Sequence, residues 1–477
     1  MTQASPKHRL PLVAKALAIL LSVLCLTKGA VHDTTIAIAL LAVLPMLWFA
    51  LRETQQVHAQ LKKLGIIFFS AIIAICLLQW LLSSAGDSAA LWQEIATIHG
   101  GKIHDTLTQD KATWLQSIGR LVFLIVIFTT ALCIGSTEAS ARHFLEMLLI
   151  SGTVCITITF LIATSDGVPM TTFYSYTHGF VNPNNAATYM GVMLLIVLAQ
   201  VFRFLKIPPK AFYKVFLEFI DKLSMPVIFK GGFLLFTLLL SMAGLFMTGS
   251  RGGIIVTFLS SLLFCIIILF KMNLQSEMRK GIIITAGIIM TMMCFWIFLN
   301  FGQVALNKLS IQGADTNSRL DIYAATFPMI GNHPLLGAGI GSFPGVFQAY
   351  RPQTISSDGI IDKAHNSYLE FAAEMGLPAL ALLLTIIGII AHTLYRGIRE
   401  HKEYYLLPTL GLSVLTLGAM HSLVDFPLQV PAIAALFIAI ITVCFSQNAR
   451  PFCVAAEKPP EPTKRVRTRT KRARKSI

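Results

Sequence analysis

Long apolar runs recur along almost the whole chain. Nearly all of these runs have about 18 to 21 residues, close to the ~20 residues that a helix needs to cross ~30 Å of hydrocarbon. The 477 residues are 55% hydrophobic and only 13% charged, so the chain has more apolar side chains than one soluble core can bury. These features exclude a soluble enzyme and predict an all-α polytopic membrane protein.

Twelve of these runs are bounded by charges, Gly, Pro or Asn and are predicted to be transmembrane helices. They lie near residues 10–27, 34–51, 64–82, 118–135, 144–164, 186–204, 231–248, 253–270, 281–299, 367–395, 406–424 and 429–446. When the loops are assigned alternately, about three quarters of the 38 Lys and Arg residues fall on one side. The positive-inside rule makes that side cytoplasmic, and both termini lie there.

The chain divides into a transmembrane domain, residues 1–447, and a C-terminal tail, residues 448–477. The tail mixes prolines with a dense run of Lys and Arg between residues 464 and 475. It is too polar to fold alone, so we expect a disordered cytoplasmic tail that lies on anionic lipid rather than binding nucleic acid.

One predicted outer loop, residues 302–364, is longer than a structureless connection usually is. Pro, Gly, Asn and charged residues are spread along it. Weak helical periodicity over residues 318–329 predicts that the loop is partly helical and folded over the membrane surface. Long loops of this kind often carry function.

A polar motif interrupts two apolar runs at residues 248–253, whose sequence is TGSRGG. Its glycines allow a tight turn that exposes backbone N–H groups beside the Arg251 cation. Such a turn at the N-terminus of the next helix suits a phosphate group. The alternative is a plain hairpin turn whose Arg251 snorkels to the interface.

The long loop offers further cations and a glycine-rich turn. Arg319 is a second guanidinium and a candidate for a binding site, whereas Lys308 and Arg351 are interpreted as solvated surface charges. Residues 337–341, GAGIG, have no preceding strand, so a dinucleotide loop is excluded and a flexible turn is predicted.

The segment after the loop carries a histidine and two acids. We expect His365 at the entry to a helix, with Asn366 as its N-cap and with Glu370 and Glu374 one turn apart. Acids at membrane depth are unfavourable unless they serve a site or pair with a base.

A second His–acid pair, His421 and Asp425, has the spacing i, i+4 near the outer end of the eleventh predicted helix. On one helix face, the carboxylate would orient the imidazole. A purely structural hydrogen bond between the two side chains is the alternative.

Motifs for metal-dependent or hydrolytic chemistry are absent from the sequence. There is no D-x-D, H-E-x-x-H, G-x-S-x-G or Walker motif, and the eight cysteines form no C-x-x-C pair. We therefore expect no cofactor and no metal, and we expect arginine to handle any anionic phosphate.

In type and order, residues 248–253, 318–320, 332–339 and 365–369 resemble the bacterial O-antigen ligase and polymerase superfamily. The resemblance covers roughly residues 179–431 and includes the Gly/Asn turn at residues 179–185. His365, Asn366 and Gly376 fit the pattern of the ligases, from which Ala379 departs. Residues 421–428 are similar to a segment typical of exopolysaccharide polymerases and protein O-oligosaccharyltransferases.

The resemblance implies a metal-independent, inverting glycosyltransferase of the bacterial inner membrane, with a site open to the periplasm. The donor would be a glycan on undecaprenyl diphosphate, and the acceptor a hydroxyl of a glycan, of lipid A core or of a protein. The resemblance favours an O-antigen ligase acting in lipopolysaccharide and other surface polysaccharide biosynthesis. A repeat-unit polymerase or a protein O-oligosaccharyltransferase is the alternative.

The resemblance also assigns roles to residues. Arg251 and Arg319 would bind the diphosphate, and His365 would polarise or deprotonate the acceptor hydroxyl. The residues expected to shape or support the acceptor site are Asn182, Asn185, Asn366, Glu370, His421 and Asp425.

A transporter or flippase of an anionic lipid-linked substrate is the alternative from another functional class. Transporters place charged or helix-breaking positions near the bilayer midplane in repeat-related helices. Here the polar residues gather at predicted outer helix ends and in one loop, and no internal repeat is evident. The enzyme is therefore favoured.

The predicted topology is testable by cysteine-accessibility labelling. A reagent applied from the outside should label a cysteine introduced at Ser356 in the long loop and should not label one introduced at Thr463 in the tail. The reverse pattern would contradict the orientation derived from the Lys and Arg distribution.

Overall fold

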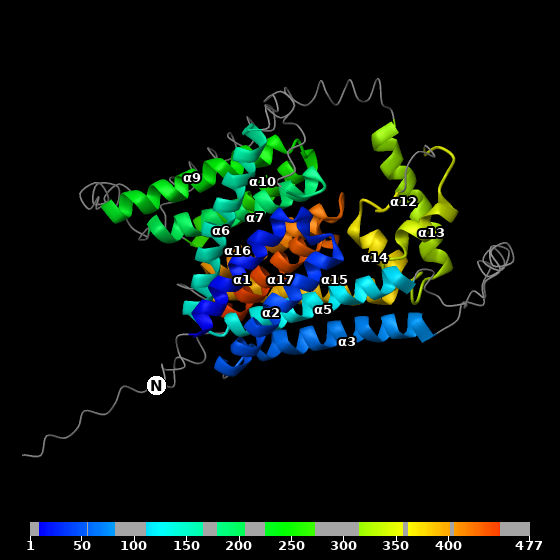
Figure 1. Ribbon diagram of the computed structural model, residues 1–477, viewed down its shortest axis with the longest axis horizontal. Coiled ribbons are helices and arrows are strands. Elements are labelled where there is room, and N and C mark those ends of the chain that lie inside the picture. Colours follow the sequence, from blue (N-terminus) through cyan, green and yellow to red (C-terminus); the bar gives the residue numbers. More distant parts are fainter. Residues whose placement is uncertain are drawn as a thin grey trace, which may run out of the picture.

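The computed structural model describes residues 9–54, 56–81, 111–165, 179–205, 225–271, 314–355, 361–400 and 405–448. All regular structure in these ranges is helical (Figure 1). The helices before the long loop are α1 (Arg9–Leu26), η2 (Lys28–Ala30), α2 (Asp33–Glu53), α3 (Ala59–Leu81), α5 (Lys111–Ile134), α6 (Glu138–Ser165), α7 (Pro183–Leu205), α9 (Met225–Met247) and α10 (Arg251–Lys271). The later helices are α12 (Ala314–Asn332), α13 (Phe343–Tyr350), α14 (Ser367–Met375), α15 (Leu377–Glu400), α16 (Leu406–His421), η4 (Pro427–Gln429) and α17 (Pro431–Ser446).

Nine of the described helices are long and apolar enough to cross a membrane, judged by length and composition: α1, α2, α3, α5, α6, α7, α9, α10 and α15. The helices α16 and α17 are apolar but shorter. The predicted crossing at residues 281–299 lies outside the described residues, as does nearly all of the predicted tail. The all-helical membrane class is confirmed, whereas the number of twelve crossings stays a prediction.

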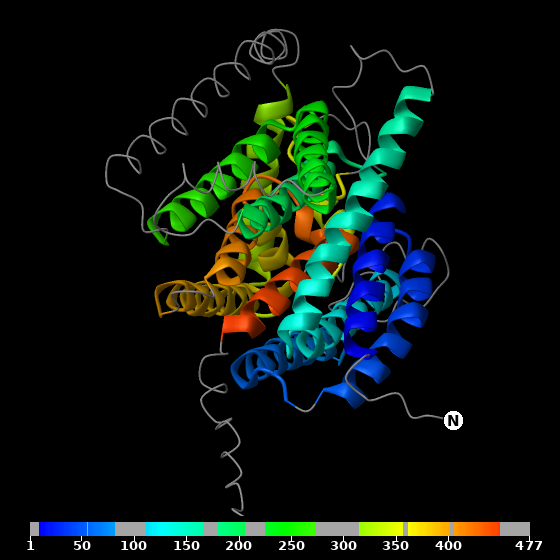
Figure 2. The same cartoon turned by 90° about the vertical axis from the view of Figure 1, so that its left-hand side faces the viewer.

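The centre of the bundle is α17, which is buried along nearly its whole length. It packs against α5, α16 and α1. A helix that is apolar on every side must be surrounded by other helices, and alanines at positions 432, 435 and 439 let neighbouring backbones approach closely. This core separates α9 and α10 from α3, which lie on opposite sides of the molecule in both views (Figures 1 and 2).

The prediction of one helix over residues 367–395 is wrong, because the segment forms two helices, α14 and α15. The break is at Gly376, whose φ of 84° lies in the left-handed region. Glycine just after one helix and proline just inside the next are common end and start signals. Gly376 and Pro378 supply both within an otherwise apolar run.

The long loop carries α12 and α13, which pack with α14 at one end of the bundle (Figure 1). A small apolar core holds this outer layer together and includes Ile322, Met329, Phe343, Phe347 and Ala373. The predicted helical content of the loop is therefore confirmed by α12 and α13. The periplasmic position of the layer stays a prediction.

The segment 337–341, predicted to be a flexible turn, is packed tightly against α14. The Ala338 N–H donates to the Ala373 carbonyl (2.8 Å) and the Gly339 N–H to the Glu374 carbonyl (3.1 Å). The buried Gln79 of α3 donates to the Glu374 carbonyl (2.8 Å) and accepts from the Ile340 N–H (3.2 Å). These bonds fasten the outer layer to α3, so the flexible-turn prediction is wrong.

Substitution of Gly376 tests this junction. In Gly376→Ala, a Cβ would lie 2.3 Å from the Leu335 carbonyl oxygen, and an L-residue at this φ stores about 1–3 kcal/mol of strain. We expect a lower midpoint of thermal unfolding. The matched control is Gly388→Ala in α15, where a Cβ meets nothing within 4 Å. An equal effect of the two changes would contradict the close approach.

Candidate functional site

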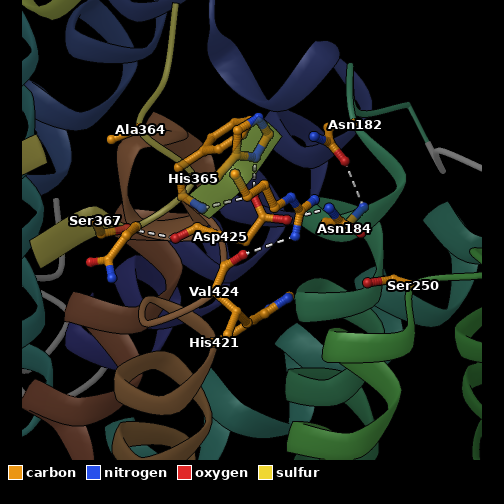
Figure 3. A network of polar contacts seen from close by, with 12 residues as sticks. Asn182, Asn184, Ser250, Ala364, His365, Ser367, His421, Val424 and Asp425 are labelled. Atoms are coloured by element: carbon orange, nitrogen blue, oxygen red, sulfur yellow. Dashed lines mark hydrogen bonds and ion pairs between the residues drawn. The ribbon is translucent and has the colours of Figure 1, made fainter. Parts of the chain in front are cut away.

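Four segments that are distant in the sequence meet where the outer layer joins the bundle. They are the turn after α16, the entry to α14, the start of α7 and the first half of α12 (Figure 3). Asp425 lies at the centre of this group and is 1% exposed.

The Asp425 carboxylate is held from several sides. Its Oδ2 accepts a hydrogen bond from the Asn184 side chain, and its Oδ1 accepts one from the Phe426 N–H (2.8 Å). His365 Nδ1 lies 3.9 Å from Oδ1, which is ion-pair distance rather than hydrogen-bond distance. Burial alone would raise the pKa of Asp425, but His365, His421 and the Phe426 N–H together hold it below its usual value. Asp425 is therefore ionised at neutral pH.

His365 is presented in an unusual backbone conformation. Its φ is 52°, which is uncommon for a residue with a side chain. Tyr323 on α12 donates its hydroxyl to the His365 carbonyl (2.8 Å), and the imidazole meets the Phe426 ring edge to face. The side chain is 28% exposed. The histidine thus has a fixed backbone and an imidazole that solvent or a ligand can reach.

The first turn of α14 is fastened to the turn that carries Asp425. The Asn366 side chain accepts from the N–H groups of Tyr368 and Leu369, which confirms the predicted N-cap. Its amide also donates to the Leu423 carbonyl (3.0 Å). The Ser367 N–H donates to the Ser422 carbonyl (2.9 Å), and the Ser367 hydroxyl to the Asp425 carbonyl (3.1 Å).

Glu370 holds the residues just before His365. Its Oε1 pairs with Lys363 Nζ (3.2 Å), and its Oε2 accepts from the Ala364 N–H (2.7 Å). Burial lowers the pKa of Lys363, but the charges of Glu370, Glu374 and Asp362 and the hydrogen bond to Glu370 together outweigh this, so the pKa lies above its usual value. The Glu370 residue itself is only 2% exposed. The acid therefore has a base as its partner, and it supports the histidine through the backbone.

Arg319 approaches the same turn from α12. Its Nη1 donates to the Val424 carbonyl (3.2 Å), next to Asp425 in the chain. Tyr323 lies four residues later on the same helix face and contacts His365. One face of α12 thus places a cation and a hydroxyl beside the histidine and the aspartate.

Arg251 is the first residue of α10, directly after the turn that ends α9. Ser250 in this turn caps the helix, because its hydroxyl accepts from the Gly253 N–H (3.2 Å). The turn lies against α16, where a Cβ at Gly253 would be 3.4 Å from His421 Cε1. The Arg251 side chain is exposed and has no hydrogen bond or ion pair among the described residues.

The expectation that Asp425 orients His421 is wrong. His421 is 2% exposed, and its Nδ1 is 2.7 Å from the Thr188 hydroxyl of α7. The spacing i, i+4 fails because α16 ends at His421 and the chain then turns. Asp425 therefore faces His365 and Asn184 instead.

The Gly/Asn turn before α7 contributes through a residue that the sequence did not single out. Asn184 contacts Asp425, whereas Asn182 accepts the Asn184 N–H (2.8 Å). Asn185 is buried, and its Oδ1 has no hydrogen bond among the described residues. The prediction from sequence also omitted Thr188 and Tyr323. Thr188 lies four residues after Asn184, and Tyr323 lies four residues after Arg319. This helical spacing was the signal that could have identified them.

Comparison with known protein families adds an independent observation. Residues 236–384 match the family model described as O-Antigen ligase. This segment of the chain is similar to the O-antigen ligase family. The matched segment contains Arg251, Arg319 and His365. Arg319 and His365 meet at the turn after α16, and Arg251 begins α10, which packs against α16. No curated protein matches the chain at a significant level.

Arg351, which was interpreted as a solvated surface charge, lies apart from this group. Arg351 donates to the Gln348 side chain (3.2 Å) in α13, and Lys308 lies outside the described residues. Ala379, where the ligase pattern has another residue, is buried near the start of α15. Among the described residues, no three His, Cys, Asp or Glu side chains form a group that could hold a metal.

Substitution of Glu370 tests its support of His365. Glu370→Ala leaves Lys363 and the buried Ala364 N–H without their partner, and an unpaired buried group costs about 1–3 kcal/mol. We expect a lower free energy of unfolding and faster hydrogen exchange at the Ala364 amide, with a smaller effect on exchange in Glu370→Gln. The control is Glu400→Ala, which breaks an exposed pair with Arg396. Unchanged exchange at Ala364 would contradict the role of Glu370.

Proposed function

We propose that the protein is a metal-independent, inverting glycosyltransferase that moves a glycan from undecaprenyl diphosphate to an acceptor hydroxyl on the periplasmic side. The observation that carries this proposal is the meeting of His365, the buried Asp425 and Arg319 at one turn. The similarity of residues 236–384 to the O-antigen ligase family supports a membrane glycosyltransferase with a lipid-linked glycan as substrate.

The His365 imidazole serves as the general base for the acceptor. The hydroxyl loses its proton as its oxygen attacks the anomeric carbon, and the imidazole takes that proton. The imidazolium so formed lies beside the ionised Asp425, which stabilises it and orients the ring. Asn184 and the Phe426 N–H keep the carboxylate in place.

The diphosphate leaving group is bound by arginine. Negative charge develops on it as the glycosidic bond breaks on the side opposite the incoming hydroxyl. Guanidinium groups aimed at these oxygens stabilise that charge with charge-assisted hydrogen bonds. Arg319 and Arg251 take this role, and the exposed Arg251 side chain is free to bind the phosphates of the donor.

For the biological role, we favour an O-antigen ligase that acts in the bacterial inner membrane with both termini in the cytoplasm. The fit of His365, Asn366 and Gly376 to the ligase pattern supports this choice over a repeat-unit polymerase or a protein O-oligosaccharyltransferase. The basic tail then lies on anionic lipid at the cytoplasmic surface.

A transfer assay with purified protein, lipid-diphosphate donor and excess EDTA tests the reaction and the roles of the residues. Arg251→Ala or Arg319→Ala should weaken binding of a donor analogue by about 10- to 150-fold, since a charged hydrogen bond contributes ~1.5–3 kcal/mol. His365→Ala should spare this binding and lower kcat by about 10²- to 10⁴-fold. Asp425→Asn should also spare donor binding and slow turnover or raise the acceptor KM.

The matched control is Arg351→Ala, which removes a cation from the outer layer away from the site. It should change neither donor-analogue binding nor kcat. Equal loss of donor binding in His365→Ala and Arg251→Ala would assign the histidine to the diphosphate site instead. Loss of transfer in EDTA with recovery on adding Mg²⁺ or Mn²⁺ would contradict a metal-independent reaction.

A further inference from the structure

A cavity of about 450 Å³ lies on the other side of α16 from Arg251 and Arg319. Its walls come mainly from α3, α5, α14, α15, α16 and α17 and are largely apolar. The lining on α3 runs from Leu61 to Ile72, about 17 Å at ~1.5 Å per residue. The cavity is therefore an elongated slot that follows the helices through more than half of the ~30 Å hydrocarbon core.

Most polar groups of the slot gather at one end, beside α14. Ser367 and Tyr368 line this end together with Lys363, Glu370 and Glu374. Ser367 also donates to the Asp425 carbonyl, so the polar end of the slot adjoins the candidate site. A ligand with a long apolar chain and a polar head matches this distribution, and its head would lie next to the His365 region.

The charges at the polar end are balanced within the protein. Lys363 is paired with Glu370 (3.2 Å), and Arg120 lies 3.4 Å from Asp33. Burial, with a contribution from Glu370, raises the pKa of Glu374 to about 7. This end can therefore form hydrogen bonds with a neutral or hydroxyl-bearing head group. Among the described residues it has no unpaired cation that would bind an anionic diphosphate.

The arginines and the slot lie on opposite faces of α16. Leu417 and His421 face α7 and α10, as the bond from His421 to Thr188 shows. Leu415 and Ala419 line the slot. The same separation is visible in the bundle, where α10 and α3 lie on opposite sides (Figures 1 and 2).

We propose that the slot binds the hydrocarbon chain of a lipid-linked glycan acceptor, while the donor diphosphate binds on the α10 side. The assignment rests on the proposed transferase function, because such an enzyme needs two substrates that meet at one point. The cation-bearing face suits the donor. The apolar slot, whose charged groups are paired, then binds the second lipid, which is the acceptor. The sugar hydroxyl of this acceptor reaches His365 past Ser367 and Tyr368.

The probe for the slot is hexadecyl glucoside with a diazirine in its chain, added to the full-length protein in nanodiscs. Light should crosslink it to residues of α3, α15 and α17 that line the slot. Leu383→Trp fills the slot and should reduce this labelling severalfold. The matched control is Leu384→Trp, the next residue, which is 48% exposed on the outside of α15 and does not line the slot.

The control separates binding in the slot from contact with bulk lipid. Equal labelling of the two Trp variants would show that the probe lies only in the surrounding bilayer and would overturn the proposal. Displacement of the probe by undecaprenyl diphosphate would assign the slot to the donor and would also overturn it. Labelling that survives this competitor supports the proposal.

Transfer kinetics provide the second readout. Leu383→Trp should raise the KM for a lipid-anchored acceptor severalfold and leave unchanged both donor-analogue binding and the KM for the same glycan without its lipid. An unchanged KM for the anchored acceptor would overturn the assignment. If the wild-type protein transferred no glycan at all, the proposed function would fail, whereas the labelling would still decide what the slot binds.

Discussion

The buried carboxylate of Asp425 is the group on which the rest of the site depends. A carboxylate with 1% exposure is tolerated only where hydrogen bonds or charges compensate for the lost water. Asn184 from α7, the Phe426 N–H and the nearby His365 provide this compensation, so the carboxylate draws α7 and the entry of α14 toward the turn after α16. Removal of any one partner would leave the negative charge of Asp425 partly uncompensated in a buried site, which is energetically unfavourable.

A second set of contacts gives this carboxylate a fixed frame. Gln79, Glu370 and Asn366 each bond to backbone groups of the outer layer or of the turn. Such bonds restrain the position of the chain without adding reactive groups, and the left-handed φ of His365 persists because its carbonyl and its neighbours are held. The outer layer is thus a rigid platform on the bundle, even though the sequence reads there as a long polar loop.

The sequence predicted the helical class, the N-cap at Asn366 and the polar turn at the start of α10, because each depends on local rules of period, capping and turn chemistry. It failed where an apolar run hid the break at Gly376, and where a spacing of four residues was assumed to mean one helix face at His421 and Asp425. It also missed Asn184, since three asparagines stand close together in the chain and only tertiary contact distinguishes them. The slot could not be foreseen either, because its walls come from six α-helices and the sequence does not show which helices are neighbours.

The placement of α16 between the slot and the arginine face has a kinetic consequence. Two lipids held on opposite faces of one helix need not take turns in a shared channel, so both can be present when the glycan moves. Such an arrangement gives a ternary complex and intersecting double-reciprocal plots, instead of the parallel lines of an enzyme that first takes the glycan onto itself. If the proposed two-sided binding holds, the carrier lipid and the glycosylated product would leave into the membrane on opposite flanks of α16.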